Sequence, residues 1–177
     1  MEIENYDKAI ENYEKTLDYK NNKDIVDKIN LAKEIKESKA NYEKAMELYN
    51  KKDYLGALES FKKVSKRDSK RFNLAQDKIK ECINIYVNEN LDKAKALAKD
   101  KKYKEAHAYL DKVLSIDKEN VVAKNLKDQY IKEEKELQEE IKKAGERSKK
   151  SRKRSKKSKL KKEQKNKKKK IKTYKDR

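Results

Sequence analysis

Three short segments with regularly spaced apolar residues recur along the chain, and each begins with a tyrosine. The three segments, called lines below, begin at Tyr6, Tyr54 and Tyr103, at separations of 48 and 49 residues. An alanine follows each tyrosine after three residues, a large apolar residue after seven, and a Thr or Val after ten. These positions are Ala9, Ala57 and Ala106; Tyr13, Phe61 and Leu110; and Thr16, Val64 and Val113. Offsets of 0, 3, 7 and 10 follow one face of an α-helix. The pattern predicts three short helices, the first over Tyr6–Tyr19, with repeats starting near residues 6, 54 and 103.

Longer stretches with apolar residues at three- or four-residue steps separate these lines. They cover roughly residues 23–51, 69–100 and 119–144. The segments NNKD (21–24), RDSK (67–70) and DKEN (117–120) supply Asn, Asp or Ser where each long helix would begin, and Asp53 stands before Tyr54. Such residues cap helix N-termini. Gly145 is a plausible C-terminal stop for the third long helix.

The composition favours helices and disfavours an enzyme. The chain has no proline and only two glycines, although a sheet protein needs many turn residues. We therefore expect an all-α fold. His107 and Cys82 are the only residues of their types, so no disulfide within one chain and no histidine metal cluster can form. We expect no catalytic site, no cofactor and no metal.

The short lines resemble the second helix of a tetratricopeptide repeat. The family signature there is Tyr-x-x-Ala-Leu-x-x-(Phe/Tyr)-x-Lys-Ala, and YLGALESFKKV (54–64) is similar to it, as are YDKAIENYEKT (6–16) and YKEAHAYLDKV (103–113). In the first helix of the family's repeat, a small residue follows a large aromatic residue. Ala45 and Ala94 match the small residue, but the large residue before each lies one position later than in the family. The resemblance covers residues 4–130 at most. It implies antiparallel helical hairpins stacked in an open array, here three short helices alternating with three long ones.

Two departures from the family change the expectation. The period is about 48 residues where the family has 34, so the first helix of each pair should be extended. The chain also opens on a second-helix line, which indicates either a piece of a longer protein or a degenerate cap. The acidic start, MEIENYDKAI, is not a secretory signal, and no apolar run is long enough to cross a membrane. As the chain stands we expect a cytoplasmic protein; an exported or membrane-anchored parent would change that.

Charge divides the chain into a nearly neutral body and a basic end. Residues 145–177 hold nineteen Lys or Arg and three acids, and so carry +16 of the net charge of +19. Like charges at this density repel, so a helical repeat domain over 1–144 and a disordered or transiently helical tail over 145–177 are expected.

The resemblance implies a partner groove along the long helices, since ligands of such arrays usually lie there. By position it would be lined by Tyr42, Met46, Tyr49, Leu91 and Lys95. Aromatic residues and a methionine make an adaptable surface for a peptide. The alternative is that Tyr42 and Tyr49 belong to the core and pack against Tyr54 and Ala57.

The leading hypothesis is a non-enzymatic scaffold that binds a peptide or partner helix, with self-association as a further possibility at the exposed ends of the stack. The alternative function is binding of a polyanion (RNA, DNA, anionic lipid or cell-wall polymer) by the tail through counterion release. A purely solubilising tail is the third interpretation. The candidate polyanion contacts are Lys149, Lys150, Arg152, Lys153, Arg154, Lys156, Lys157, Lys167, Lys168, Lys169 and Lys170.

Overall fold

Six helices make up the secondary structure of the described chain, and no strand is found in it. The computed structural model describes residues 5–19 and 22–175, and the side chains of these residues except 18 and 165–175. The helices are α1 (Tyr6–Tyr19), α2 (Lys23–Asn50), α3 (Tyr54–Phe61), α4 (Ser69–Lys99), α5 (Tyr103–Ile116) and α6 (Val121–Lys175). The predicted all-α fold is confirmed, and short helices alternate with long ones.

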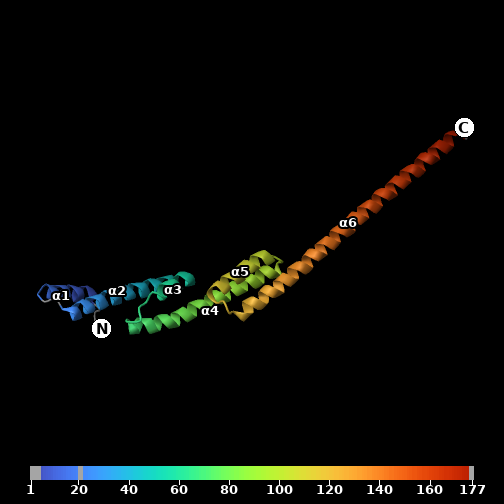
Figure 1. The fold of residues 1–177 in the computed structure, drawn as a ribbon. Helices are drawn as coiled ribbons and strands as arrows, with labels where there is room; N and C mark the ends of the chain where they lie inside the picture. The colour runs from blue at the N-terminus through green and yellow to red at the C-terminus, as the bar shows by residue number, and fades with distance from the viewer. Residues whose placement is uncertain (1–4, 20–21, 176–177) are drawn as a thin grey trace.

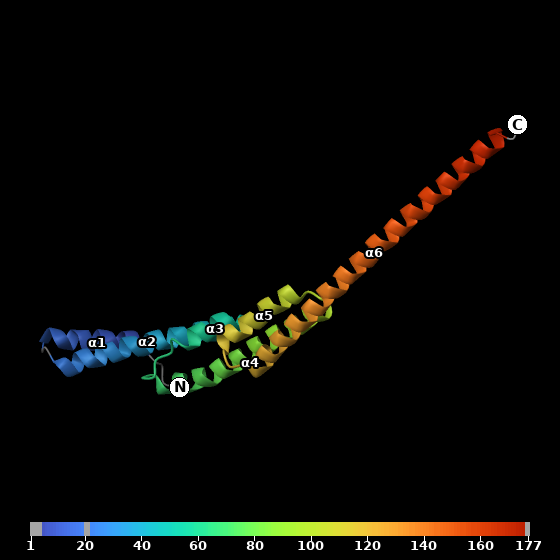
Figure 2. The ribbon, with the colours of Figure 1, turned by 45° about the vertical axis from the view of Figure 1, so that its right-hand side comes forward.

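Each long helix that lies between two short ones packs against both. The first part of α2 faces α1, where Lys33 Nζ lies 3.0 Å from Glu14 Oε1. Its last part faces α3, where the ring centroids of Tyr42 and Phe61 are 5.6 Å apart. The same arrangement joins α4 to α3 and then to α5. Because consecutive helices overlap only in part, the stack is elongated, as both ribbon views show (Figures 1 and 2).

Two hydrophobic cores result, one around each of the later short helices. The first core consists of Ala45, Ala57, Leu58, Phe61, Val64, Ala75 and Cys82. The second core consists of Val87, Leu91, Ala94, Ala98, Tyr103, Ala106, Leu110, Val113, Ala123 and Tyr130. Ile83, in the middle of α4, packs against both. The sequence stripe of α5 is buried throughout and that of α3 nearly so, but in α1 Tyr13 is only half-buried and Thr16 is exposed.

Two turns of the same geometry join the long helices α2 and α4 to the short helices that follow. In each, a lysine adopts the left-handed backbone conformation, with φ of 63° at Lys52 and 61° at Lys101. The N–H of Asp53 then donates to the Leu48 carbonyl at 2.9 Å, and Lys102 makes the equivalent bond at 2.9 Å. This pattern is a Schellman motif, which satisfies carbonyls left open at a helix end. The two hairpins are therefore closed in the same way, one repeat period apart.

The predicted N-caps are confirmed. The side chains of Asn22, Asp53, Asp68 and Asn120 accept hydrogen bonds from backbone N–H groups two or three residues further on. These bonds fix where α2, α3, α4 and α6 begin.

The predicted end of the third long helix at Gly145 is wrong. Where the sequence predicts a disordered or transiently helical tail from residue 145, α6 continues to Lys175. Lys, Arg, Gln and Glu have high helix propensity, no proline interrupts them, and a single internal glycine costs a helix only about 1 kcal/mol. We call residues 121–144 the inner half of α6 and residues 145–175 its outer half.

Candidate functional site

Three of the five predicted groove residues lie on the last part of α2, against α3. Tyr42 meets Phe61 edge-on, and Tyr49 meets Tyr54 edge-on with ring centroids 5.7 Å apart. Met46 is half-buried against the first core, as are both tyrosines. These side chains therefore fill the space between α2 and the helices packed on it.

Tyr49 also joins α2 to α4. Its hydroxyl donates a hydrogen bond to the carboxylate of Glu81, and the ammonium of Lys78 lies 4.2 Å from its ring centroid. Lys78 Nζ lies 2.8 Å from Glu81 Oε2. The bond to Glu81 is the main cause that raises the pKa of Tyr49, and the bond from Lys78 is the main cause that lowers the pKa of Glu81. Tyr49 thus contacts both Glu81 and Lys78, which are also paired with each other.

Leu91 and Lys95 are set apart from these three residues. Leu91 is 6% exposed within the second core, so it offers no open surface to a partner. Lys95 is exposed, and its Nζ lies 3.5 Å from Asp92 Oδ1. The structure therefore brings together Tyr42, Met46 and Tyr49 beside the first core, whereas Leu91 lies in the second core and Lys95 on the surface.

The outer half of α6 presents its cations to solvent. Every described side chain from Gly145 to Gln164 is exposed. Eleven Lys or Arg lie between Arg147 and Lys162, and they include the candidate contacts Lys149, Lys150, Arg152, Lys153, Arg154, Lys156 and Lys157. The side chains of the remaining candidates, Lys167, Lys168, Lys169 and Lys170, lie outside the described ones.

Few acids accompany these cations. Only Glu146 and Glu163 fall in residues 145–164, whereas acids alternate with lysines in the inner half, where Lys143 Nζ lies 3.7 Å from Glu139 Oε2. Within the part of α6 whose side chains are described, no ion pair joins a cation of the outer half to an acid. The positive charge of this segment is left uncompensated by the protein itself.

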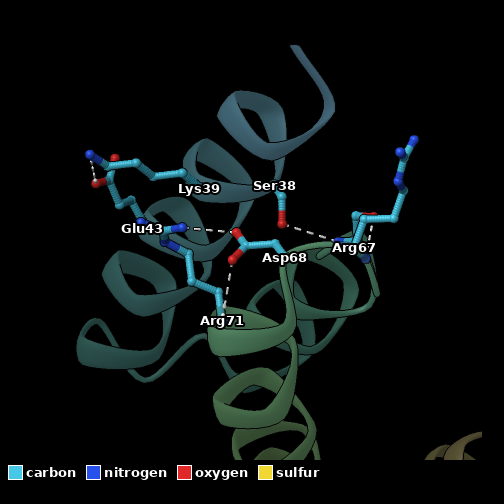
Figure 3. Close-up of polar contacts among 7 residues, drawn as sticks. Ser38, Lys39, Glu43, Arg67, Asp68 and Arg71 are labelled. Carbon is cyan, nitrogen blue, oxygen red and sulfur yellow. Dashed lines mark hydrogen bonds and ion pairs between the residues drawn. The ribbon is translucent and has the colours of Figure 1, made fainter. Parts of the chain in front are cut away.

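A polar cluster that sequence reasoning missed holds the loop between α3 and α4 (Figure 3). Asp68 is 6% exposed and accepts hydrogen bonds from the backbone N–H of Arg71 at 3.4 Å and from its Nη1 at 2.9 Å. The buried Ser38 of α2 accepts a bond from the Ser65 N–H at 3.1 Å. Arg67 Nη1 reaches Glu34 Oε2 at 3.1 Å. The N-cap role of Asp68 is readable from sequence, but its partners in space are not.

His107 and Cys82 serve packing. Cys82 is fully buried in the first core, and burial raises the pKa of its thiol. The ring of His107 lies edge-on to Tyr130 at 6.4 Å between centroids, and neither ring nitrogen has a hydrogen-bond partner. The residue as a whole is half-buried.

The described residues contain neither a group of side chains that could hold a metal ion nor a helix that could span a membrane. Among them, no three His, Cys, Asp or Glu side chains are grouped so that they could hold a metal ion. No helix in the same part of the chain is both long and apolar enough to span a bilayer.

No protein-family model, no curated protein and no solved structure matches this chain.

Proposed function

We propose that this chain is a non-enzymatic, tetratricopeptide-like helical array that binds polyanions through the outer half of α6. The observation that carries the proposal is the row of eleven exposed cations between Arg147 and Lys162 on a segment that packs against no other described helix. Binding a polyanion releases condensed counterions, which is favourable and needs no pocket. The same charges destabilise the free helix by mutual repulsion, and a bound polyanion would remove that repulsion.

The repeat character of the body is supported by its two closed hairpins. The turns at Lys52 and Lys101 share one backbone geometry and are 49 residues apart, the same interval as between Tyr54 and Tyr103. The stripes that follow them are buried in equivalent ways, with Phe61 and Leu110 both fully enclosed. In this proposal the array is the rigid body from which the basic helix extends.

The second candidate is a scaffold that binds a partner helix along α2 and α4. It is favoured by one observation: Met46 and Tyr49 remain only half-buried beside α4. The burial of Leu91 and the packing of Tyr42 on Phe61 reduce the surface available for it.

The test compares two variants of the full chain for binding to a labelled polyphosphate and to a labelled DNA duplex. In the first variant, seven cations become Gln: Lys149, Lys150, Arg152, Lys153, Arg154, Lys156 and Lys157. We expect it to lose most binding and most of the dependence of log K on log salt, whose slope is about 0.9 per phosphate contact on duplex DNA. The second variant, Met46→Ala, should retain both the binding and its salt dependence. Circular dichroism checks that each variant is folded. Binding that persists in the first variant and disappears in the second would contradict the proposal.

A further inference from the structure

The cations of the outer half leave one side of the helix free. At about 100° per residue, Ser148, Ser151, Ser155 and Ser158 fall within a sector of about 80°. We call these four residues the serine stripe. No Lys or Arg enters this sector between residues 148 and 161, and Lys162 ends it. The stripe continues, at three- and four-residue steps, the line of Ile141 and Ala144.

Cations lie on both sides of the serine stripe and behind it. Arg147, Arg154 and Lys161 follow one border of the stripe, and Arg152 and Lys159 follow the other. The opposite face of the helix carries Lys149, Lys153 and Lys157, together with Leu160, which is 58% exposed. The helix is therefore positive on two flanks and on its back, with a narrow side of small hydroxyl groups between the flanks.

We infer that the polyanion is double-stranded DNA and that the outer half of α6 lies in its major groove, with the serine stripe toward the base edges. This inference rests on the proposed function and names its ligand. The major groove of B-DNA is about 12 Å wide and admits an α-helix of about 10–12 Å diameter. A helix seated there has a wall of phosphates on each side, which matches cations on two flanks.

Small residues on the side that faces the groove floor allow the helix axis to come close to the base pairs. Serine hydroxyls can donate to or accept from any base, so they give contact without strong sequence preference. The flanking Arg and Lys then reach phosphates on both strands, which position the helix and supply most of the affinity.

Other polyanions fit this distribution less well. The major groove of A-form RNA is deep and too narrow for side chains to read, so it does not take a helix in this way. An anionic membrane is a flat surface and engages one face of a helix, usually an apolar one, whereas Leu160 is the single apolar residue between Gly145 and Gln164.

The rest of the molecule leaves the outer half accessible on all sides. α6 extends away from the stack of α1–α5, and only its inner half runs beside α5 (Figures 1 and 2). A duplex could therefore take the outer half into its groove without meeting the array.

The experiment removes three charges from different sides of the helix in the full chain. The flank variant is Arg152→Gln, Arg154→Gln and Lys159→Gln; the back variant is Lys149→Gln, Lys153→Gln and Lys157→Gln. A companion variant, Arg152→Lys with Arg154→Lys, keeps the two positive charges and replaces only the guanidinium groups. It shows whether binding depends on the charge at these positions or on the arginine side chain. Fluorescence anisotropy with a labelled 20-base-pair DNA duplex gives K over a range of salt concentrations.

In the flank variant we expect the magnitude of the slope of log K against log salt concentration to fall by about 3, because three phosphate contacts are lost and each contributes about 0.9. In the back variant the change should be below about 1. The companion variant should bind nearly as the parent does. A duplex RNA of the same sequence and phosphatidylserine vesicles should bind more weakly than the DNA at the same salt.

If the slope fell equally in the flank and back variants while the parent still bound tightly, the groove arrangement would be overturned. The outer half would then bind as a polycation with no preferred face. Tighter binding to the RNA duplex or to the vesicles would overturn DNA as the ligand. A parent chain that binds none of these probes would overturn the proposed function itself.

Discussion

The two halves of α6 belong to one continuous helix, but the inner half packs against α5 and the outer half does not. In the inner half, Ala123 is fully buried and Tyr130 is 4% exposed, with Leu126 and Leu137 packed beside them against α5. In the outer half every described side chain is exposed. Helix-favouring residues fill both halves, but the halves differ in charge balance and in the stripe. The inner half mixes acids with lysines and has an apolar stripe, whereas the outer half is cationic and has a serine stripe. Propensity sets the backbone conformation, and the stripe decides whether the helix gains tertiary contacts.

Comparison with α2 and α4 explains why α6 does not turn back. Those helices end in the turns at Lys52 and Lys101, and a tyrosine two residues later begins the next buried stripe. One further period of 49 residues after Tyr103 leads to Arg152. No buried stripe begins there, so a fourth short helix would have nothing to pack with, and the chain continues as helix.

The largest difference between the two regions should come from removing a leucine side chain in each. Leu110→Ala deletes a fully buried side chain of the second core and should cost about 2–5 kcal/mol in the free energy of unfolding. Leu160→Ala in the outer half should change it by less than about 0.5 kcal/mol, because that side chain is exposed. Urea unfolding followed by circular dichroism measures both. Comparable losses would show that the outer half is packed as well.

The next largest difference should be in thiol reactivity between the first core and the outer half of α6. Iodoacetamide at pH 7.5 should react with the native Cys82 at least about a hundredfold more slowly than with an exposed cysteine, because the reaction requires opening of the first core. The comparison variant is Cys82→Ala with Ser148→Cys, which places the thiol on the outer half. Rapid labelling of native Cys82 would contradict its enclosure.

Cys82 also predicts a weak dependence of stability on alkaline pH. Burial raises the pKa of this thiol above its ordinary value of 9.0, so the folded state holds the proton more tightly than the unfolded chain does. Its contribution to stability is complete below pH 9 and declines as the pH rises further. Cys82→Ala should remove this part of the decline in urea titrations between pH 8 and 10; an unchanged decline would assign it to other groups.

A smaller effect is expected at the two turns. Lys52→Gly and Lys101→Gly should each stabilise the fold by about 0.5–1 kcal/mol, because glycine adopts the left-handed conformation without the steric cost that lysine has there. Lys80→Gly, in the interior of α4 at an exposed position, is the control and should cost about 1 kcal/mol. Thermal unfolding would show whether the two turns respond alike; opposite signs would mean that the hairpins are not equivalent.

The most local effect concerns the glycine that links the halves of α6. Gly145→Ala meets open space and should strengthen the helix locally by about 0.5–1 kcal/mol. Gly56→Ala should gain less, because the new Cβ would lie 2.5 Å from Asp53 Oδ2 and disturb that cap. Amide exchange near each site measures the change, and a larger gain at Gly56 would contradict the cap geometry.

Much of the fold could be predicted from local pattern. The stripes headed by Tyr54 and Tyr103, the caps at Asn22, Asp53, Asp68 and Asn120, and the six helices all follow from residue spacing, which acts over one or two helical turns. The end of α6 did not, because Gly145 resembles a C-cap and its effect on the helix is small beside that of the residues around it.

The candidate site could be predicted only in part. The basic segment is evident from composition, yet the bond between Tyr49 and Glu81 and the cluster around Asp68 join residues about thirty positions apart. Such contacts depend on how α2 and α4 are placed in space, which a single sequence does not specify. The placement of Leu91 in the second core has the same origin.

The most direct test is amide hydrogen exchange on the full chain with and without a DNA duplex. In the free protein, α4, α5 and the inner half of α6 should be protected, while residues 145–164 should exchange quickly because no tertiary contact holds that helix. Adding the duplex should slow exchange in residues 145–164 and leave α2 and α4 unchanged. Protection that appears along α2 and α4 instead, with residues 145–164 unaffected, would contradict the account and transfer the binding surface to the array.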